Sequence, residues 1–120
     1  MNATPFFEVE QIGRTVVVTN FSEMDEFTFD EMEAEGGEVF ERLSKATAEN
    51  VVVDLHGISR CQSTALGFFV KLAKRTREAG GRMAFCNLSE TVQEVMRVTH
   101  LDKIWTICDS RADALAEVEK

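Results

Sequence analysis

The spacing of apolar residues along the chain follows two different repeats. Short runs rich in valine, isoleucine and phenylalanine alternate with longer stretches whose apolar residues recur every three or four positions. The first pattern is typical of strands and the second of amphipathic helices. Strands are predicted at residues 6–10, 14–19, 51–55, 82–86 and 104–107. Helices are predicted around Val39, Phe40, Leu43, Ala46 and Thr47 and at residues 63–79, 89–99 and 110–118.

The predicted elements follow the order β-β-α-β-α-β-α-β-α. After the opening hairpin, strands and helices alternate, which favours a largely parallel sheet with right-handed crossovers and helices packed on it. The valine run at 51–53 suits a strand that is buried on both faces. A chain of 120 residues has room for one domain, 1–120, with an ordinary core. We therefore expect an α/β fold with a mixed, largely parallel sheet of about five strands and four helices.

Polar residues and glycines mark the ends of three of the helices. Ser89 and Ser110 are predicted N-caps, because a serine oxygen can accept a hydrogen bond from the first turn. Gly80 and Gly81 are predicted to end the 63–79 helix. The start of the first helix is left open, because residues 28–30 offer two caps but a pair of glycines would then lie inside the helix.

Charge is concentrated in one segment of the chain. The net charge is −8, and residues 23–49 carry ten acids against Arg42 and Lys45. This segment is either a solvated helix face with an acidic loop or an acidic docking surface for a basic partner. An acidic chain lacks the basic face that a phosphate backbone requires, so we expect no nucleic-acid partner.

The sequence offers no sign of a targeting segment, a metal site or a cofactor. Residues 1–5 lack the basic start and apolar stretch of a secretory signal, and the apolar run 65–70 is too short to span a bilayer. Cys61, Cys86 and Cys108 have neither a zinc spacing nor that of a disulfide framework, and the last two lie in apolar runs. We expect a cytoplasmic protein without direct membrane insertion, cofactor or metal.

The start of the 63–79 helix is the main candidate site. With Ser63 placed at 0° and about 100° per residue, Gly67, Lys71, Lys74 and Glu78 fall on the side of Ser63, between roughly 20° and 80°. The same construction places Leu66, Phe69, Val70 and Ala73 on an apolar side, with Phe68 and Leu72 at its flank. We therefore expect the Ser63 hydroxyl to face solvent, with no side chain at Gly67 to cover it. The alternative interpretation is that Ser63 serves only as an N-cap.

A series of short motifs from residue 51 onward occurs in a family-specific order. They are Val51-Val52-Val53-Asp54-Leu55, Gly57-Ile58, Ser63-Thr64-Ala65-Leu66-Gly67, residues 74–82, Cys86-Asn87-Leu88, Val95, Thr99, Leu101-Asp102-Lys103 and Ile107-Cys108-Asp109. In this series the chain resembles the STAS domain family, and bacterial anti-sigma factor antagonists in particular. The N-terminal third matches that family in element order more than in residues.

The resemblance implies a phosphorylation site. The family pattern at the helix start, Asp-Ser-Ser/Thr-Gly-Leu-Gly, places the phosphorylated serine on Ser63 and the next hydroxyl on Thr64. Gln62 stands where the family usually has aspartate, and Ala65 where it usually has glycine. The missing carboxylate leaves three outcomes open: phosphorylation at Ser63 is lost, is altered in specificity, or moves to Thr64.

The resemblance also implies a partner and a mechanism. The partner would be an anti-sigma factor that is itself an ATP-binding serine kinase. Unphosphorylated, the chain would capture this partner and so regulate sigma-factor-dependent transcription. Phosphorylated, it would release the partner, and it would have no catalytic residues of its own. The expected partner-binding residues are Gln62, Ser63, Thr64, Gly67, Lys71 and Lys74.

Two other classes of function remain open. STAS domains also serve as scaffold subunits of stress-signalling assemblies and lipid-transport complexes, without acting as kinase targets. A small hydrolase could use Ser63 and His56, with Asp54 orienting the histidine, although no G-x-S-x-G elbow is present. The apolar flank at Phe68 and Leu72 further suggests a homodimer or partner contact at that face.

Overall fold

The computed structural model describes residues 2–3, 7–20, 37, 39, 41, 43, 48–58 and 63–120, with the backbone alone at 2, 3, 7, 20 and 63–65. The strands are β1 (Asn2–Ala3), β2 (Phe7–Ile12), β3 (Thr15–Asn20), β4 (Asn50–Asp54), β5 (Met83–Cys86) and β6 (Thr106–Cys108). The helices are α2 (Ser63–Glu78), α3 (Glu90–Val98), α4 (Arg111–Val118) and the 3-10 helix η2 (Leu101–Lys103).

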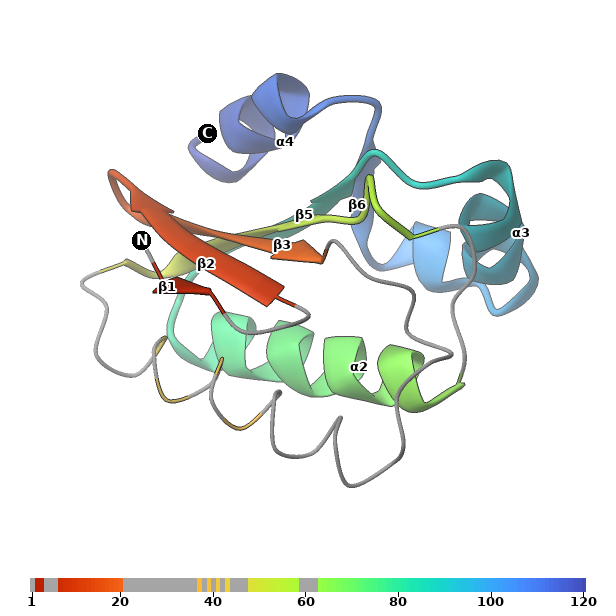
Figure 1. Cartoon of the computed structure of the whole chain (residues 1–120), viewed down its shortest axis with the longest axis horizontal. Coiled ribbons are helices and arrows are strands. Elements are labelled where there is room, and N and C mark those ends of the chain that lie inside the picture. The colour runs from red at the N-terminus through yellow and green to blue at the C-terminus, as the bar shows by residue number, and fades with distance from the viewer. Residues whose placement is uncertain are drawn as a thin grey trace.

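The six strands form one sheet in the order in which they occur along the chain. Strands β1, β2 and β3 pair antiparallel, and β3, β4, β5 and β6 pair parallel. This confirms the mixed, largely parallel sheet, to which the two-residue β1 adds a short edge strand. Figure 1 shows α2 and α4 on opposite faces of the sheet. The predicted first helix lies mostly outside the described residues, but positions 37, 39, 41 and 43 are helical.

Alternation along β4 explains why the valine run is buried on both faces. Val51 and Val53 belong to the larger apolar cluster, which includes residues of α2 and α3. Val52 points the other way, into a smaller cluster with Ala114 and Val118 of α4. Because successive side chains of a strand point to opposite faces, three consecutive valines contribute to two cores. Each fully buried side chain of this size contributes about 1.5–3 kcal/mol.

The buried side of α2 differs from the predicted one. Phe68, Phe69 and Leu72 are at most 6 % exposed, whereas Val70 is 49 % exposed. The prediction that Val70 belongs to the apolar side of the helix is therefore wrong. Phe68 and Leu72, which were expected at the edge of that side, are buried against the rest of the protein. A dimer contact through Phe68 and Leu72 is also ruled out, because both are covered within one chain.

The predicted caps are confirmed. The Ser89 hydroxyl accepts a hydrogen bond from the Val92 N–H, and the Ser110 hydroxyl accepts one from the Asp113 N–H. Beyond α3 the prediction is less accurate, because η2 occupies residues 101–103 and the last strand begins at residue 106 instead of 104. Ile104 is consequently 74 % exposed, outside the sheet.

Two glycines end α2, each for a different reason. The Gly80 N–H donates to the Arg77 carbonyl and the Gly81 N–H donates to the Thr76 carbonyl, a Schellman arrangement in which Gly80 has φ +81°. Gly81 instead lies against the backbone before β4, so that a Cβ atom there would overlap the Glu49 carbonyl. The helix end is therefore fixed to the sheet by a close backbone contact.

Gly81→Ala is expected to lower the free energy of unfolding by about 1–3 kcal/mol, because backbone must move to admit the methyl group. Gly67→Ala is the matched control within the same helix. A Cβ atom at Gly67 meets no atom within 4 Å, so alanine should raise stability by about 0.5–1 kcal/mol. Urea unfolding of both variants measures the difference. Equal stability of the Gly81 variant and the unsubstituted protein would contradict the close contact.

Candidate functional site

The chain between β4 and α2 is anchored by two buried apolar side chains. Leu55 and Ile58 are 0 % and 3 % exposed, and the Ile58 N–H donates to the Leu55 carbonyl at 3.0 Å. Helix α2 then begins at Ser63, as predicted. The predictions for Gln62 and for Cys61 fall outside the described residues.

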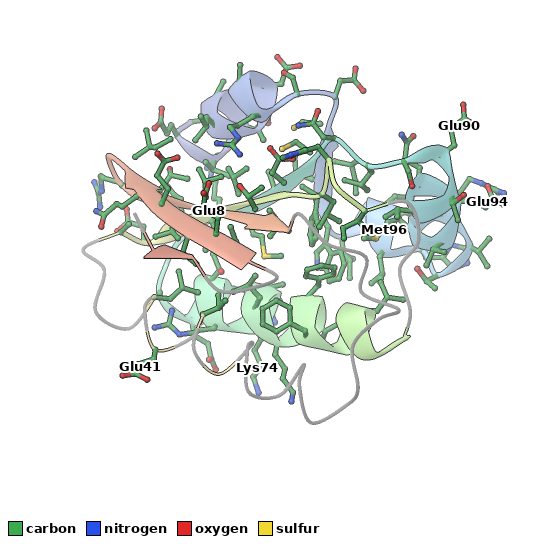
Figure 2. The ribbon with its side chains drawn as sticks, viewed as in Figure 1. Glu8, Glu41, Lys74, Glu90, Glu94 and Met96 are labelled. Atoms are coloured by element: carbon green, nitrogen blue, oxygen red, sulfur yellow. The ribbon has the colours of Figure 1, made fainter. Side chains whose placement is uncertain are left out.

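The expected polar stripe of α2 is exposed. Gly67, Lys71 and Lys74 all lie on the solvent side of the helix, and Val70 joins them there. Figure 2 shows the Lys74 side chain extending from α2 away from the sheet. No atom lies within 4 Å of the place where a Cβ of Gly67 would be. The helix therefore presents an open surface one turn beyond Ser63, whose own side chain, like that of Thr64, is outside the description.

A buried carboxylate holds the end of β4. Asp54 is 3 % exposed in its side chain. Its Oδ1 accepts hydrogen bonds from the backbone N–H of His56 at 3.0 Å, from the His56 ring Nδ1 at 2.9 Å and from Asn87 Nδ2 at 3.2 Å. Its Oδ2 accepts from Arg111 Nε at 3.0 Å, and the same guanidinium donates to Thr19 Oγ1 at 2.8 Å. This network connects β3, β4, the turn after β5 and the start of α4.

Two opposing effects set the pKa of Asp54. Burial raises it, since a charged carboxylate loses its hydration. Hydrogen bonds from His56, Asn87 and Arg111 lower it, and together they outweigh burial, so the pKa lies below its ordinary value of 3.8. The carboxylate is therefore ionised near neutral pH and pairs with the Arg111 guanidinium.

The structure contains the histidine–aspartate pair of the hydrolase arrangement, formed by His56 and Asp54. The Asp54 carboxylate does orient the His56 ring, which is 55 % exposed. However, the same carboxylate also accepts hydrogen bonds from Arg111 and Asn87. In a catalytic triad the aspartate instead accepts a hydrogen bond from the histidine ring and orients it. The pair fits a structural network that fixes the turn after β4 better than it fits a catalytic site.

The two described cysteines both have raised pKa values. Burial and the neighbouring Asp54 carboxylate raise the pKa of the Cys86 thiol to about 12. Burial is also the largest cause of the raised pKa of Cys108. Both are free thiols, and Cys86 acts as the small buried hydrophobe that its apolar run predicts.

Two other kinds of feature are absent from the described part of the chain. Among them, no three histidine, cysteine or acidic side chains are grouped so that they could hold a metal ion. Within the same part of the chain, no helix has the length and apolar character needed to cross a membrane.

Apart from His56, the residues of the Asp54 network were not identified from the sequence. Thr19, Asn87 and Arg111 come from three distant parts of the chain. The available signal was the acid itself, because a carboxylate that ends a run of buried valines needs donors from elsewhere in the fold. The buried acid predicts that a hydrogen-bond donor lies nearby, but it does not identify the donor residue.

Comparisons with known proteins agree on one family. A family model described as "STAS domain" matches residues 6–114. An anti-sigma F factor antagonist from Paenibacillus polymyxa is 28 % identical over 112 residues, which cover 93 % of each chain. The crystal structure of an anti-sigma factor antagonist from Thermotoga maritima superposes with a TM-score of 0.81 at 23 % identity, covering 95 % of each chain. The unphosphorylated form of the antagonist SpoIIAA superposes with a TM-score of 0.77 at 20 % identity, covering 94 % of this chain and 96 % of that one.

Proposed function

Because the chain belongs to the STAS domain family, we propose that it is an anti-sigma factor antagonist switched by phosphorylation at Ser63. In its unphosphorylated form it captures an anti-sigma factor that is also a serine kinase, and phosphorylation releases that partner. The observation that carries the proposal is the exposed stripe of Gly67, Lys71 and Lys74 on α2, which begins one turn beyond the helix start at Ser63. The related SpoIIAA has known structures in both phosphorylated and unphosphorylated forms, which supports a switch of this kind.

A phosphate at Ser63 is compatible with the fold. It would add about −1.5 to −2 charges at the N-terminus of a sixteen-residue helix, where the dipole and the free N–H groups favour an anion. The first turn of α2 contains no acidic residue that would repel it. The switch therefore needs no change of backbone conformation.

The effect of the phosphate would be on the partner. A protein that packs closely over Gly67 would have to bury the new charge and its bulk at the interface. Burying an uncompensated charge costs several kcal/mol, enough to abolish a moderate affinity. Lys71 and Lys74, further along the same exposed side, belong to the same proposed contact surface.

The experiment that tests this proposal maps the phosphate. The protein is incubated with ATP and each purified anti-sigma factor kinase of its source organism, and the modified residue is located by mass spectrometry. We expect one phosphate on Ser63, no incorporation in Ser63→Ala and normal incorporation in the matched variant Thr64→Ala. Incorporation lost in the Thr64 variant and kept in the Ser63 variant would move the site to Thr64.

One observation favours a second candidate. Gln62 replaces the aspartate that usually precedes the phosphorylated serine in this family. The fold also superposes on an RsbS variant from Moorella thermoacetica and on the stressosome, each at 10 % identity with TM-scores of 0.77 and 0.72. A scaffold subunit that uses the same surface without being phosphorylated is therefore the alternative. Stable partner binding without phosphate transfer by any of the kinases would favour it.

A further inference from the structure

A groove lies at the other end of α2, away from Ser63. It measures about 380 Å³ and runs between the C-terminal half of α2 and the segment that precedes β6. Its apolar lining includes Val70, Met83, Ile104 and Trp105. Trp105 stacks on Phe85 with ring centroids 4.8 Å apart, so the indole is held by the core on one side. Val70 and Ile104 are 49 % and 74 % exposed, which makes the groove an unusually apolar part of the surface.

Two cations border this groove. Lys74 and Arg77 line it, and within the described part of the chain the lining contains no carboxylate. Among the described residues, neither of these side chains forms an ion pair. These two cations give the groove a charge opposite in sign to the net charge of −8 on the whole chain. Its chemistry fits an acidic segment with bulky apolar side chains, and tryptophan and arginine are the residues most common at the energetic centres of protein contacts.

The same chain contains a segment with the complementary chemistry. Residues 21–36 carry seven acids and no base, interleaved with three phenylalanines and two methionines. The segment of residues 71–82, which supplies part of the groove's wall, carries five bases and one acid, and two of these bases, Lys74 and Arg77, line the groove. Opposite charges of this size steer association and set its register, while the apolar side chains supply contact area.

We propose that the groove bordered by Lys74 and Arg77 binds residues 21–36 of a second copy of this chain. The contact brings acidic side chains to the two cations and places phenylalanine or methionine side chains against Trp105, Val70 and Ile104. This inference goes beyond the proposed function and does not depend on phosphorylation of Ser63. It replaces the dimer contact through Phe68 and Leu72 that the packing of α2 rules out.

Trp105 provides a direct probe, because it is the only tryptophan of the chain. On raising the protein concentration at low salt, we expect the weight-average mass from sedimentation equilibrium to rise and the tryptophan emission to shift to the blue. At about 1 M salt, where the Debye length is about 3 Å, association should weaken. A synthetic peptide with the sequence of residues 21–36 should compete with self-association, and the same peptide with every acid replaced by its amide should not.

Substitutions of groove residues test whether self-association takes place through the groove. Arg77→Glu and Ile104→Ser should each weaken self-association at least tenfold, and both side chains are exposed enough for the fold to tolerate the change. Lys120→Glu is the matched control, since it makes the same charge change two residues beyond the end of α4, the helix on the opposite face of the sheet. A constant monomer mass at all concentrations and low salt would overturn the proposal, even if the peptide binds. Self-association that survives Arg77→Glu and Ile104→Ser would also overturn it.

Discussion

Ser63→Asp is expected to weaken binding of the anti-sigma factor partner by at least about a hundredfold, while Ser63→Ala binds like the unsubstituted protein. The added carboxylate lies at the helix start, one turn from Gly67, where the proposed partner packs closely. A buried charge without a partner costs several kcal/mol, and each 1.4 kcal/mol changes affinity tenfold. Calorimetric titration of the purified partner against each variant measures the effect.

A second helix start provides the control for this substitution. Thr91→Asp adds the same charge to the first turn of α3, at an exposed position outside the proposed surface. It should bind the partner normally. Both variants should unfold within about 0.5 kcal/mol of the unsubstituted protein, because aspartate near a helix N-terminus is well tolerated. Binding of Ser63→Asp at full strength would refute the electrostatic switch while leaving the family assignment intact.

The strands and the helix caps could be predicted because their signals are local. The alternation of Val51, Val52 and Val53 between two cores follows from the geometry of a strand alone. Ser89 and Ser110 cap their helices through hydrogen bonds that span three residues. Neither feature depends on how distant parts of the chain meet, so the sequence around each position is sufficient.

The buried side of α2 could not be predicted in the same way. Apolar residues of this helix spread over more than half of its circumference, from Phe68 round to Val70. Which part of that arc is buried depends on where the helix lies on the sheet. In the folded chain Phe69 packs edge-on against Phe85 of β5, with ring centroids 5.3 Å apart, and this orientation leaves Val70 in solvent. The contact between Phe69 and Phe85 therefore determines which side of α2 is buried.

The start of α2 at Ser63 was predictable to the residue, but the network around Asp54 was not. The helix start follows from local pattern, whereas Arg111 reaches Asp54 across 57 residues of sequence. Nothing near Arg111 in the sequence distinguishes it from the other arginines of the chain. Long-range polar pairs of this kind become visible only when the strands and helices are in place.

Arg111→Met is expected to lower the free energy of unfolding by about 3 kcal/mol at neutral pH. The substitution leaves the Asp54 carboxylate buried without its cation, and breaking a buried pair in this way costs about 3–5 kcal/mol. The lower end applies because His56 and Asn87 still donate to the carboxylate. Removing the acid instead, in Asp54→Asn, should cost less, since the Arg111 side chain is 33 % exposed and can turn toward water or toward Glu10.

The pH dependence distinguishes this account from a simple loss of packing. The pKa of Asp54 is lowered in the folded state, so its contribution to stability is complete above the ordinary value of 3.8 and is lost as the pH falls through the folded value. In folded Arg111→Met, Asp54 keeps the burial that raises its pKa but loses the hydrogen bond from Arg111 that lowers it. The variant therefore loses less stability than the unsubstituted protein when the pH falls. Urea unfolding from pH 7 downward should therefore bring the Arg111→Met and unsubstituted proteins closer together in acid. A deficit that stayed constant with pH would assign the cost to packing of the Arg111 side chain and would contradict the electrostatic role of the pair with Asp54.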